Sequence, residues 1–229
     1  ETNTGWTTSG NALDGQWNRG IPVNCNRGDP FSDADGSGQC WLTDNSAAAN
    51  CNSDVDDGAT VLISPVLDGS VPGALLRYSR WYSNNFGADP GNDIFTVEIS
   101  DNGGASWSAL ETVGPSGEGT TGGWIEASFI LADIPGITPS SQMQLRFTAA
   151  DAGSGSVIEA GVDAIVISAI ECEAPCLGDV ANNDGQVDVN DLLAIIAAWN
   201  TSNPQFDLDG NGQVDVNDLL IVIGAWGSC

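Results

Sequence analysis

The clearest chemical signal in the sequence is a run of oxygen-bearing side chains near the C-terminus. Within residues 207–218 they occupy positions 1, 3, 5, 9 and 12 of a loop, and a glycine occupies position 6. Calcium is bound by several hard oxygen ligands at flexible distances, and this spacing can wrap such ligands around one ion. The sequence therefore predicts a calcium site whose ligands are Asp207, Asp209, Asn211, Gln213 (through its backbone carbonyl), Asp215 and Asp218.

The same segment belongs to a tandem repeat. Residues 185–199 recur as residues 212–226, and twelve of the fifteen positions are identical. After each acidic loop, apolar residues return at intervals of three and four, as on one face of a helix. We expect two short helices that pack together through Leu192, Ile195, Ile196 and Trp199 in the first copy and Leu219, Val222, Ile223 and Trp226 in the second.

The loop of the first copy contains one extra residue. Counting back from the loop glycine places Asp184 at position 5 and Asn182 at position 3, but Val180 at position 1. Asp179 comes one residue too early, so we predict that the chain bulges near Ala181 and that Asp179 still binds the ion. The expected ligands of this calcium site are Asp179, Asn182, Asp184, Gln186, Asp188 and Asp191.

The preceding part of the chain has the pattern of β-strands. Phe95, Val97 and Ile99 alternate with polar residues, as do Met143, Leu145 and Phe147, and the runs are separated by turns rich in Asn and Gly. This period of two predicts a mostly β protein with an antiparallel β-sandwich. The expected strands are 61–64, 75–82, 93–100, 107–113, 124–131, 143–149 and 157–170. The expected organisation is a sandwich over 1–171 with a long stapled loop at 24–58, a linker at 172–176 and a small helical module at 177–229.

The composition excludes several classes of function. The chain has 31 acidic and 5 basic residues, a net charge of -26, and neither Lys nor His. Nucleophilic systems that need His or Lys are therefore excluded, as is His-ligated zinc. A surface this acidic repels the phosphate backbone of nucleic acids, and we therefore expect no nucleic-acid partner. A pair of carboxylates could still hydrolyse glycosides, but no pattern places two of them across a cleft, and we expect no enzyme.

The cysteines and the hydropathy indicate a secreted protein. The six cysteines form an even set without a CxxC motif, which favours three disulfides over a zinc site. No run of apolar residues is long enough to span a membrane. Since the sequence begins at Glu1, without Met or a signal peptide, we expect a mature, processed product located outside the cell or at its surface. We prefer a Cys176–Cys229 disulfide, which would tie the ends of the module, and leave Cys25, Cys40, Cys51 and Cys172 unassigned.

Residues 176–229 resemble a dockerin domain of the loop-then-helix type. The resemblance rests on the tandem copy, on the missing helix before each loop, and on Asp rather than Glu at loop position 12. It implies two calcium ions and two antiparallel helices related by a pseudo-twofold axis. It also implies docking onto a cohesin-like β-sandwich through positions 10 and 11 of either loop, which here are Val189, Asn190, Val216 and Asn217.

Residues 1–170 resemble the jelly-roll accessory domains of secreted bacterial proteins, which are related to MAM-like domains. The resemblance is carried by residues 93–107 and 161–167, and it implies a non-catalytic domain that commonly holds structural calcium. Asp163 is a candidate ligand because a buried carboxylate needs a charged partner. Asp33, Asp35, Asp54 and Asp56 are further candidates, although each could lie in a solvated loop. The six tryptophans before residue 130 could form the sandwich core or a stacking platform for sugars.

Two non-enzymatic functions agree with these observations. The first is a calcium-loaded structural protein in which the dockerin-like module of one molecule docks on the sandwich of the next and builds extracellular fibres or a matrix. The alternative is a glycan- or protein-binding accessory module that its dockerin attaches to a cohesin-bearing partner. We expect the first function. The partners to test are a second copy of the chain, a cohesin-like sandwich and a polysaccharide.

Overall fold

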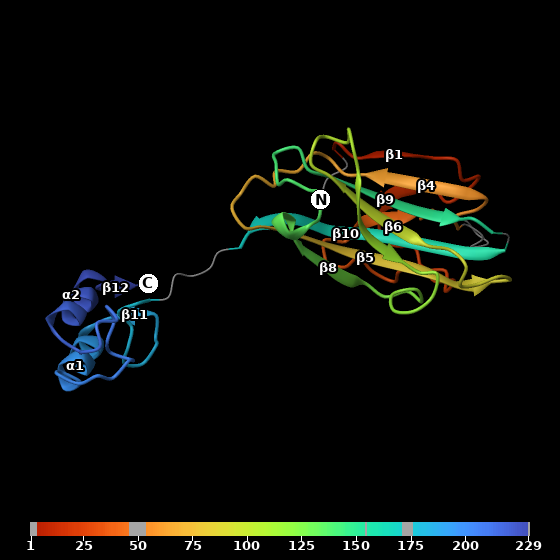
Figure 1. Ribbon diagram of the computed structural model, residues 1–229. Helices are drawn as coiled ribbons and strands as arrows, with labels where there is room; N and C mark the ends of the chain where they lie inside the picture. The colour runs from red at the N-terminus through yellow and green to blue at the C-terminus, as the bar shows by residue number, and fades with distance from the viewer. Residues whose placement is uncertain (1–3, 46–53, 154, 171–175, 229) are drawn as a thin grey trace. The chain divides into compact units, whose positions relative to one another are not determined.

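The computed structural model describes residues 4–45, 54–153, 155–170 and 176–228. It divides into two compact units, residues 1–170 and 171–229. The first unit is built from strands, and Figure 1 shows them as two facing layers. The strands are β1 (Thr7–Gly10), β2 (Trp17–Gly20), β3 (Cys40–Thr43), β4 (Gly58–Ile63), β5 (Ala74–Gly87), β6 (Phe95–Ser100), β7 (Ser108–Val113), β8 (Ile125–Ile130), β9 (Gln144–Asp151) and β10 (Ser156–Ala169), with a 3₁₀ turn at Leu131–Asp133.

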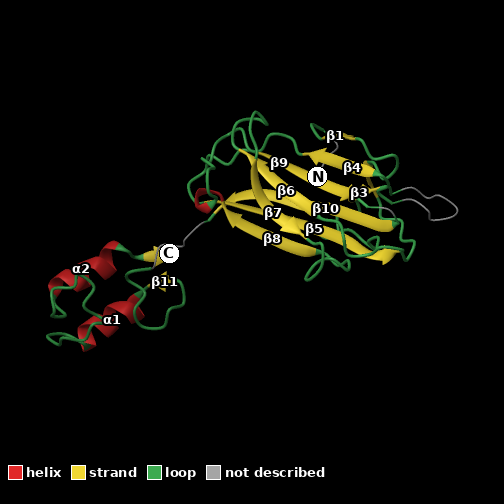
Figure 2. Ribbon diagram, turned by 45° about the vertical axis from the view of Figure 1, so that its right-hand side comes forward, coloured by secondary structure: helices red, strands yellow, loops and turns green. Residues whose placement is uncertain are grey.

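Each layer is a five-stranded antiparallel sheet. One sheet has the order β1-β4-β9-β6-β7 and the other β2-β3-β10-β5-β8. The long strands β5 and β10 pair along the middle of the second sheet (Figure 2), from Ser156 opposite Gly87 to Ala169 opposite Ala74. Their pairing shifts register between Asp163 and Val166, where Ala164 adopts a left-handed φ of 52°. The first unit is therefore a β-sandwich, as the alternating pattern predicts.

The core lies between the two sheets, where alternate residues of each strand point inward. Phe95, Val97 and Ile99 of β6 are at most 1 % exposed, and so are Leu145 and Phe147 of β9. Aromatic rings link the two layers at centroid distances of 5.5 Å (Tyr78 and Phe147) and 5.7 Å (Tyr82 and Phe95), which contributes to stability beyond the buried area alone. The prediction that these residues share one face of their strands is confirmed.

The second unit contains two short helices and a pair of two-residue strands. Helix α1 spans Val189–Ala197 and α2 spans Val216–Gly224, while β11 (Gln186–Val187) pairs with β12 (Gly227–Ser228). Each helix begins with a capping box, in which the N-cap aspartate (Asp188 or Asp215) and the aspartate three residues later bond each other's backbone N–H groups. Each acidic loop therefore ends in a firmly capped helix.

The predicted buried face of the two helices is only half correct. Ile195 and Val222 are fully buried, and Leu192 and Leu219 pack against them. Ile196 and Trp199, with their counterparts Ile223 and Trp226, are instead 45 to 54 % exposed. The helices bury the side that carries Asp191 and Asp218 and leave the neighbouring apolar stripe exposed.

No helix in the described ranges is long and apolar enough to cross a membrane.

Candidate functional site

The second acidic loop is organised around the carboxylate of Asp218, which lies in the first turn of α2 and is completely buried. It accepts three backbone hydrogen bonds, from Asp215 (2.7 Å), Leu208 (2.7 Å) and Asp209 (3.2 Å). Burial alone would raise the pKa of Asp218, but these donors outweigh it and the pKa is lowered. Asp207, Asp209 and Asp218 each bring one carboxylate oxygen within 4.8 Å of the other two, which is close enough to share a cation.

The first acidic loop has the same internal hydrogen bonds despite its extra residue. Asp191 is completely buried and accepts N–H groups from Asp188, Val180 and Ala181, each at 2.9 Å. Asp179 Oδ2 accepts the N–H of Gly185 at 2.8 Å, as Asp207 Oδ2 accepts that of Gly212 at 2.8 Å. Asp179 therefore occupies the place of Asp207, and the extra residue lies between Asp179 and the loop glycine.

Both loops contain a buried oxygen atom without a partner. Asp179 Oδ1 and Asp207 Oδ1 are shielded from solvent and have no hydrogen-bond partner among the described residues. A buried carboxylate oxygen left in this way is costly unless a cation satisfies it. The remaining predicted ligands lie nearby, although several already bond within the loop: Asn182 to Asp184, Asn211 to Asp209, and Asp188 and Asp215 as helix caps. The groups of the second loop fit one calcium ion; among the described residues of the first loop no three carboxylates come equally close together, so its ion stays a prediction.

The helix surface beside each loop is apolar and exposed. Val189 and Val216, predicted at the docking surface, are 53 and 52 % exposed, and Asn190 and Asn217 beside them are exposed too. The apolar stripe continues along both helices. Its members are 45 to 58 % exposed and come in matching pairs: Val189 and Val216, Leu193 and Leu220, Ile196 and Ile223, Trp199 and Trp226. We call these eight residues the paired helix faces.

A third group of carboxylates lies in the β-sandwich. Asp33, Asp35 and Asp163 each bring one oxygen within 4.8 Å of the other two. Asp163 is completely buried in β10, where its Oδ2 accepts the N–H of Ala34 at 2.8 Å and its Oδ1 has no hydrogen-bond partner in the described chain. Burial raises the pKa of Asp163, and the charge of Asp35 adds to this effect. The group therefore fits a cation that would tie the loop around residue 34 to β10.

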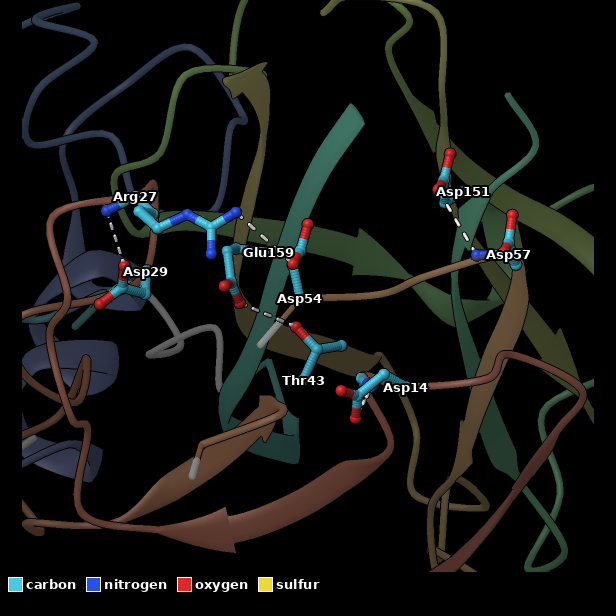
Figure 3. Close-up of polar contacts among 9 residues, drawn as sticks. Asp14, Arg27, Asp29, Thr43, Asp54, Asp57, Asp151 and Glu159 are labelled. Carbon is cyan, nitrogen blue, oxygen red and sulfur yellow. Dashed lines mark hydrogen bonds and ion pairs between the residues drawn. The ribbon is translucent and has the colours of Figure 1, made fainter. Parts of the chain in front are cut away.

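Asp54 and Asp56 do not join any such group among the described residues. Figure 3 shows Asp54 beside Arg27, whose guanidinium lies 3.6 Å from Asp54 Oδ1, and near Glu159, whose Oε2 accepts the hydroxyl of Thr43 at 3.2 Å. Burial, then the charge of Asp56, raises the pKa of Asp54 to about 6. Burial, then the charges of Asp29 and Asp54, raises the pKa of Glu159 well above its usual range.

The Glu159 cluster was not found from the sequence. Glu159 lines a small cavity with Asp29, Asp44 and Thr43, and Asp54 lies outside that lining. Its members come from loops and strands far apart in the chain, and no spacing rule connects them. A carboxylate pair for hydrolysis would have to flank a shared cleft, and this cavity does not place Asp54 and Glu159 on its two sides.

The tryptophan and cysteine predictions have different outcomes. Trp17 and Trp41 lie in the sandwich core and Trp6 packs against it, so the core interpretation is confirmed for these three. Trp81 is 9 % exposed, and Trp107 and Trp124 are half-buried, outside that cluster. Cys40 is buried. The preferred Cys176–Cys229 pairing and the partners of the other cysteines stay predictions, because Cys51, Cys172 and Cys229 lie outside the described residues.

Comparison with known proteins gives only distant structural likeness. No protein-family model matches the chain, and no curated protein matches it. The K1 cleaved adhesin domain of Lys-gingipain from Porphyromonas gingivalis W83 matches 74 % of this chain and 94 % of its own, with 17 % identity and a TM-score of 0.44. The family 11 carbohydrate-binding module from Clostridium thermocellum matches 74 and 91 %, with 11 % identity and a TM-score of 0.41. Likeness this weak supports no conclusion about ligands or site residues.

Proposed function

We propose that this protein is a calcium-dependent attachment protein, in which the dockerin-like C-terminal module docks onto a β-sandwich of a partner and the N-terminal sandwich is a binding domain. The observation that carries the proposal is the paired helix faces. After its acidic loop, each copy of the repeat exposes the same four apolar side chains, three on the helix and a tryptophan just past its end, each about half exposed. An apolar surface of this kind on a small unit is typical of an interaction site.

Calcium is the cofactor that the loops fit. Each loop has a buried, unpartnered aspartate oxygen and a fully buried aspartate at the start of its helix. The module has no basic residue to neutralise these charges. A divalent cation in each loop would satisfy the free oxygens and hold the start of α1 and of α2 in place. Val189 and Val216 lie within that first turn, so calcium would also order the docking surface.

The charge distribution favours a separate partner over a second copy of the chain. All five arginines lie before residue 171, yet 21 of the 31 acidic residues lie there as well. The sandwich and the module are therefore both acidic, and docking one onto the other brings like charges together. A cohesin-like sandwich that carries less negative charge would avoid this repulsion. Head-to-tail fibres are the second form of the proposal.

Sedimentation velocity with millimolar calcium and with excess EDTA separates these forms. We expect a monomer in both conditions, and calcium-dependent retention of the protein on a panel of immobilised cohesin domains. Large species that form with calcium and dissolve with EDTA would replace the separate partner by the head-to-tail form. Behaviour that calcium does not change in either measurement would contradict the attachment role altogether.

A further inference from the structure

A concavity on the sandwich lies where the loop of residues 24–31 meets the end of β5. Its volume is about 280 Å³, close to the lower end of the range for small-molecule sites. Its lining mixes aromatic rings with amide and hydroxyl groups. The lining residues are Asn24, Asn26, Gly28, Asp29, Phe31, Trp81, Phe86 and Thr121.

The side chains of two phenylalanines at this concavity are exposed to solvent. Phe31 is 73 % exposed and Phe86 is 38 % exposed, and neither ring packs against another aromatic ring of the described chain. Because the two rings are exposed, they add no stability to the free protein through burial. Two of them at one concavity provide apolar flat faces on which a ligand can stack.

The loop that carries Phe31 has no regular secondary structure, but hydrogen bonds hold it in place. Trp81 Nε1 donates to the carbonyl of Gly28 at 2.6 Å, and Trp124 Nε1 donates to the carbonyl of Ser32 at 2.7 Å. Gly28 lies so close to β5 that a side chain there would collide with Ser83 Oγ. The loop that carries Phe31 is thus held on both sides of that residue, which reduces the entropy lost on binding.

Polar groups with free hydrogen-bonding capacity surround the rings. The side-chain amide of Asn26 and the hydroxyl of Thr121 are exposed and make no side-chain hydrogen bond within the described structure. Thr121 also lines a second concavity of about 340 Å³, together with Asn85, Ser116 and Gly117. The two concavities therefore meet at Thr121 and offer room for a ligand longer than one ring.

We propose that this double concavity binds a neutral oligosaccharide, with sugar rings stacked on Phe31 and Phe86 and sugar hydroxyls bonded by Asn26, Thr121 and Asn85. A hexose has an apolar C–H face and a rim of hydroxyls, which matches the mixture of flat rings and amides. The net charge of -26 disfavours anionic polysaccharides. This inference rests on the proposed role of the sandwich as a binding domain and names its ligand class.

Affinity electrophoresis of the full chain in gels that contain xyloglucan, mixed-linked β-glucan or galactomannan tests the proposal, with polygalacturonate as the anionic comparison. We expect retardation by at least one neutral polysaccharide and none by polygalacturonate. Phe31→Ala and Phe86→Ala should each weaken binding about tenfold. Leu13→Ala, which removes an equally exposed apolar side chain outside both concavities, should leave binding unchanged.

Two further variants test the stacking itself. Phe31→Tyr keeps the ring and should keep most of the affinity, whereas Phe31→Leu keeps an apolar side chain without a ring and should lose it. Equal binding by Phe31→Leu and the parent would indicate an apolar ligand and overturn the proposal. So would the absence of retardation by every neutral polysaccharide, or retardation that both alanine variants leave unchanged.

The result of the polysaccharide test does not depend on the docking function of the C-terminal module. Substitutions on the paired helix faces should abolish retention by cohesin domains and leave the polysaccharide gels unchanged. A chain that binds cohesins but no neutral polysaccharide would refute the saccharide site alone. A chain that binds polysaccharide but neither cohesins nor its own copies would refute the attachment role alone.

Discussion

Asp179 and Asp207 occupy the same place in two loops of different length. Each carboxylate accepts the N–H of its loop glycine at 2.8 Å through Oδ2 and leaves Oδ1 buried without a described partner. The first loop takes up its extra residue between Ala181 and Gly185, and Asn183 there adopts a left-handed φ of 50°, as Gly210 of the shorter loop does with a φ of 71°. Asn adopts this conformation more readily than most residues. The insertion is therefore absorbed without displacing the aspartate that begins the loop.

Removing either aspartate should remove one calcium ion. We expect Asp179→Ala and Asp207→Ala each to lower the stoichiometry measured by isothermal titration calorimetry by one ion, because each variant deletes the free buried oxygen of its loop. Asp68→Ala, which deletes an exposed carboxylate of the sandwich, should change nothing. An unchanged stoichiometry in Asp179→Ala would show that the longer loop does not bind.

The sandwich should bind a further ion through Asp163. Asp163→Asn keeps an oxygen for the N–H of Ala34 but removes the charge, so we expect one bound calcium fewer and faster hydrogen exchange in residues 33–38. Asp133→Asn removes an exposed charge elsewhere and serves as the control. If the two variants bound the same number of ions, the group of Asp33, Asp35 and Asp163 would not be a cation site.

Chelation should unfold the C-terminal module before the sandwich. Residues 177–229 contain eight acidic and no basic side chains, so their loops repel one another without bound cations. Ions that bind only the folded module add roughly 4 kcal/mol per site at a thousandfold excess over the dissociation constant. Calorimetry should show two transitions, of which EDTA lowers the one that belongs to the module. A single cooperative melt that EDTA leaves unchanged would contradict this expectation.

The stability of the sandwich should decrease as the pH rises. Burial, then the nearby carboxylates, raises the pKa of Glu159 well above its usual range and that of Asp54 to about 6. Such groups bind protons more tightly in the folded state, so their contribution is complete below the unfolded pKa and is lost as the pH passes the folded pKa. Glu159→Gln should therefore raise the melting temperature at about pH 8 and flatten its dependence on pH, unlike the exposed control Glu126→Gln. A pH profile identical to that of the parent would exclude Glu159 as its source.

Either of the two helix faces should be able to support docking when the other is disrupted. Leu193→Ala or Leu220→Ala alone leaves one intact face, so we expect each to weaken cohesin binding only about twofold. The double variant should weaken it at least about tenfold, since each face then lacks a central apolar anchor. Leu177→Ala, another half-exposed residue of the module, is the control. Full binding by the double variant would place the docking surface elsewhere.

The sequence predicts the strands with clear alternation and misses the others. The strands Phe95–Ser100 and Gln144–Asp151 repeat buried apolar residues at every second position, which the pattern rule detects. Thr7–Gly10 is wholly exposed and polar, and Cys40–Thr43 is buried on both faces, so neither alternates. The strand at Cys40–Thr43 therefore lies inside the segment that we expected to be one long loop.

Spacing along the chain also explains what could be predicted of the candidate sites. Asp207, Asp209 and Asp218 lie in one short loop, and Asp163 is conspicuous in an apolar strand. Glu159 and Phe31 gain their roles from contacts between distant segments, which spacing does not reveal. In the helices, apolar residues cover more than one face, so periodicity alone could not identify the side that the buried Asp191 and Asp218 select.

The duplicated helix faces have a consequence for how the module tolerates change. In the proposed docking, a partner would approach in two orientations related by the internal repeat, and this degeneracy alone would favour association by roughly 0.4 kcal/mol. Substitutions that disrupt one copy should weaken partner binding by little more than that statistical factor. The two copies can therefore drift apart in sequence, one at a time, while the protein stays attached. The three differences among the fifteen repeated positions lie outside the paired helix faces, so the two faces carry the same residues.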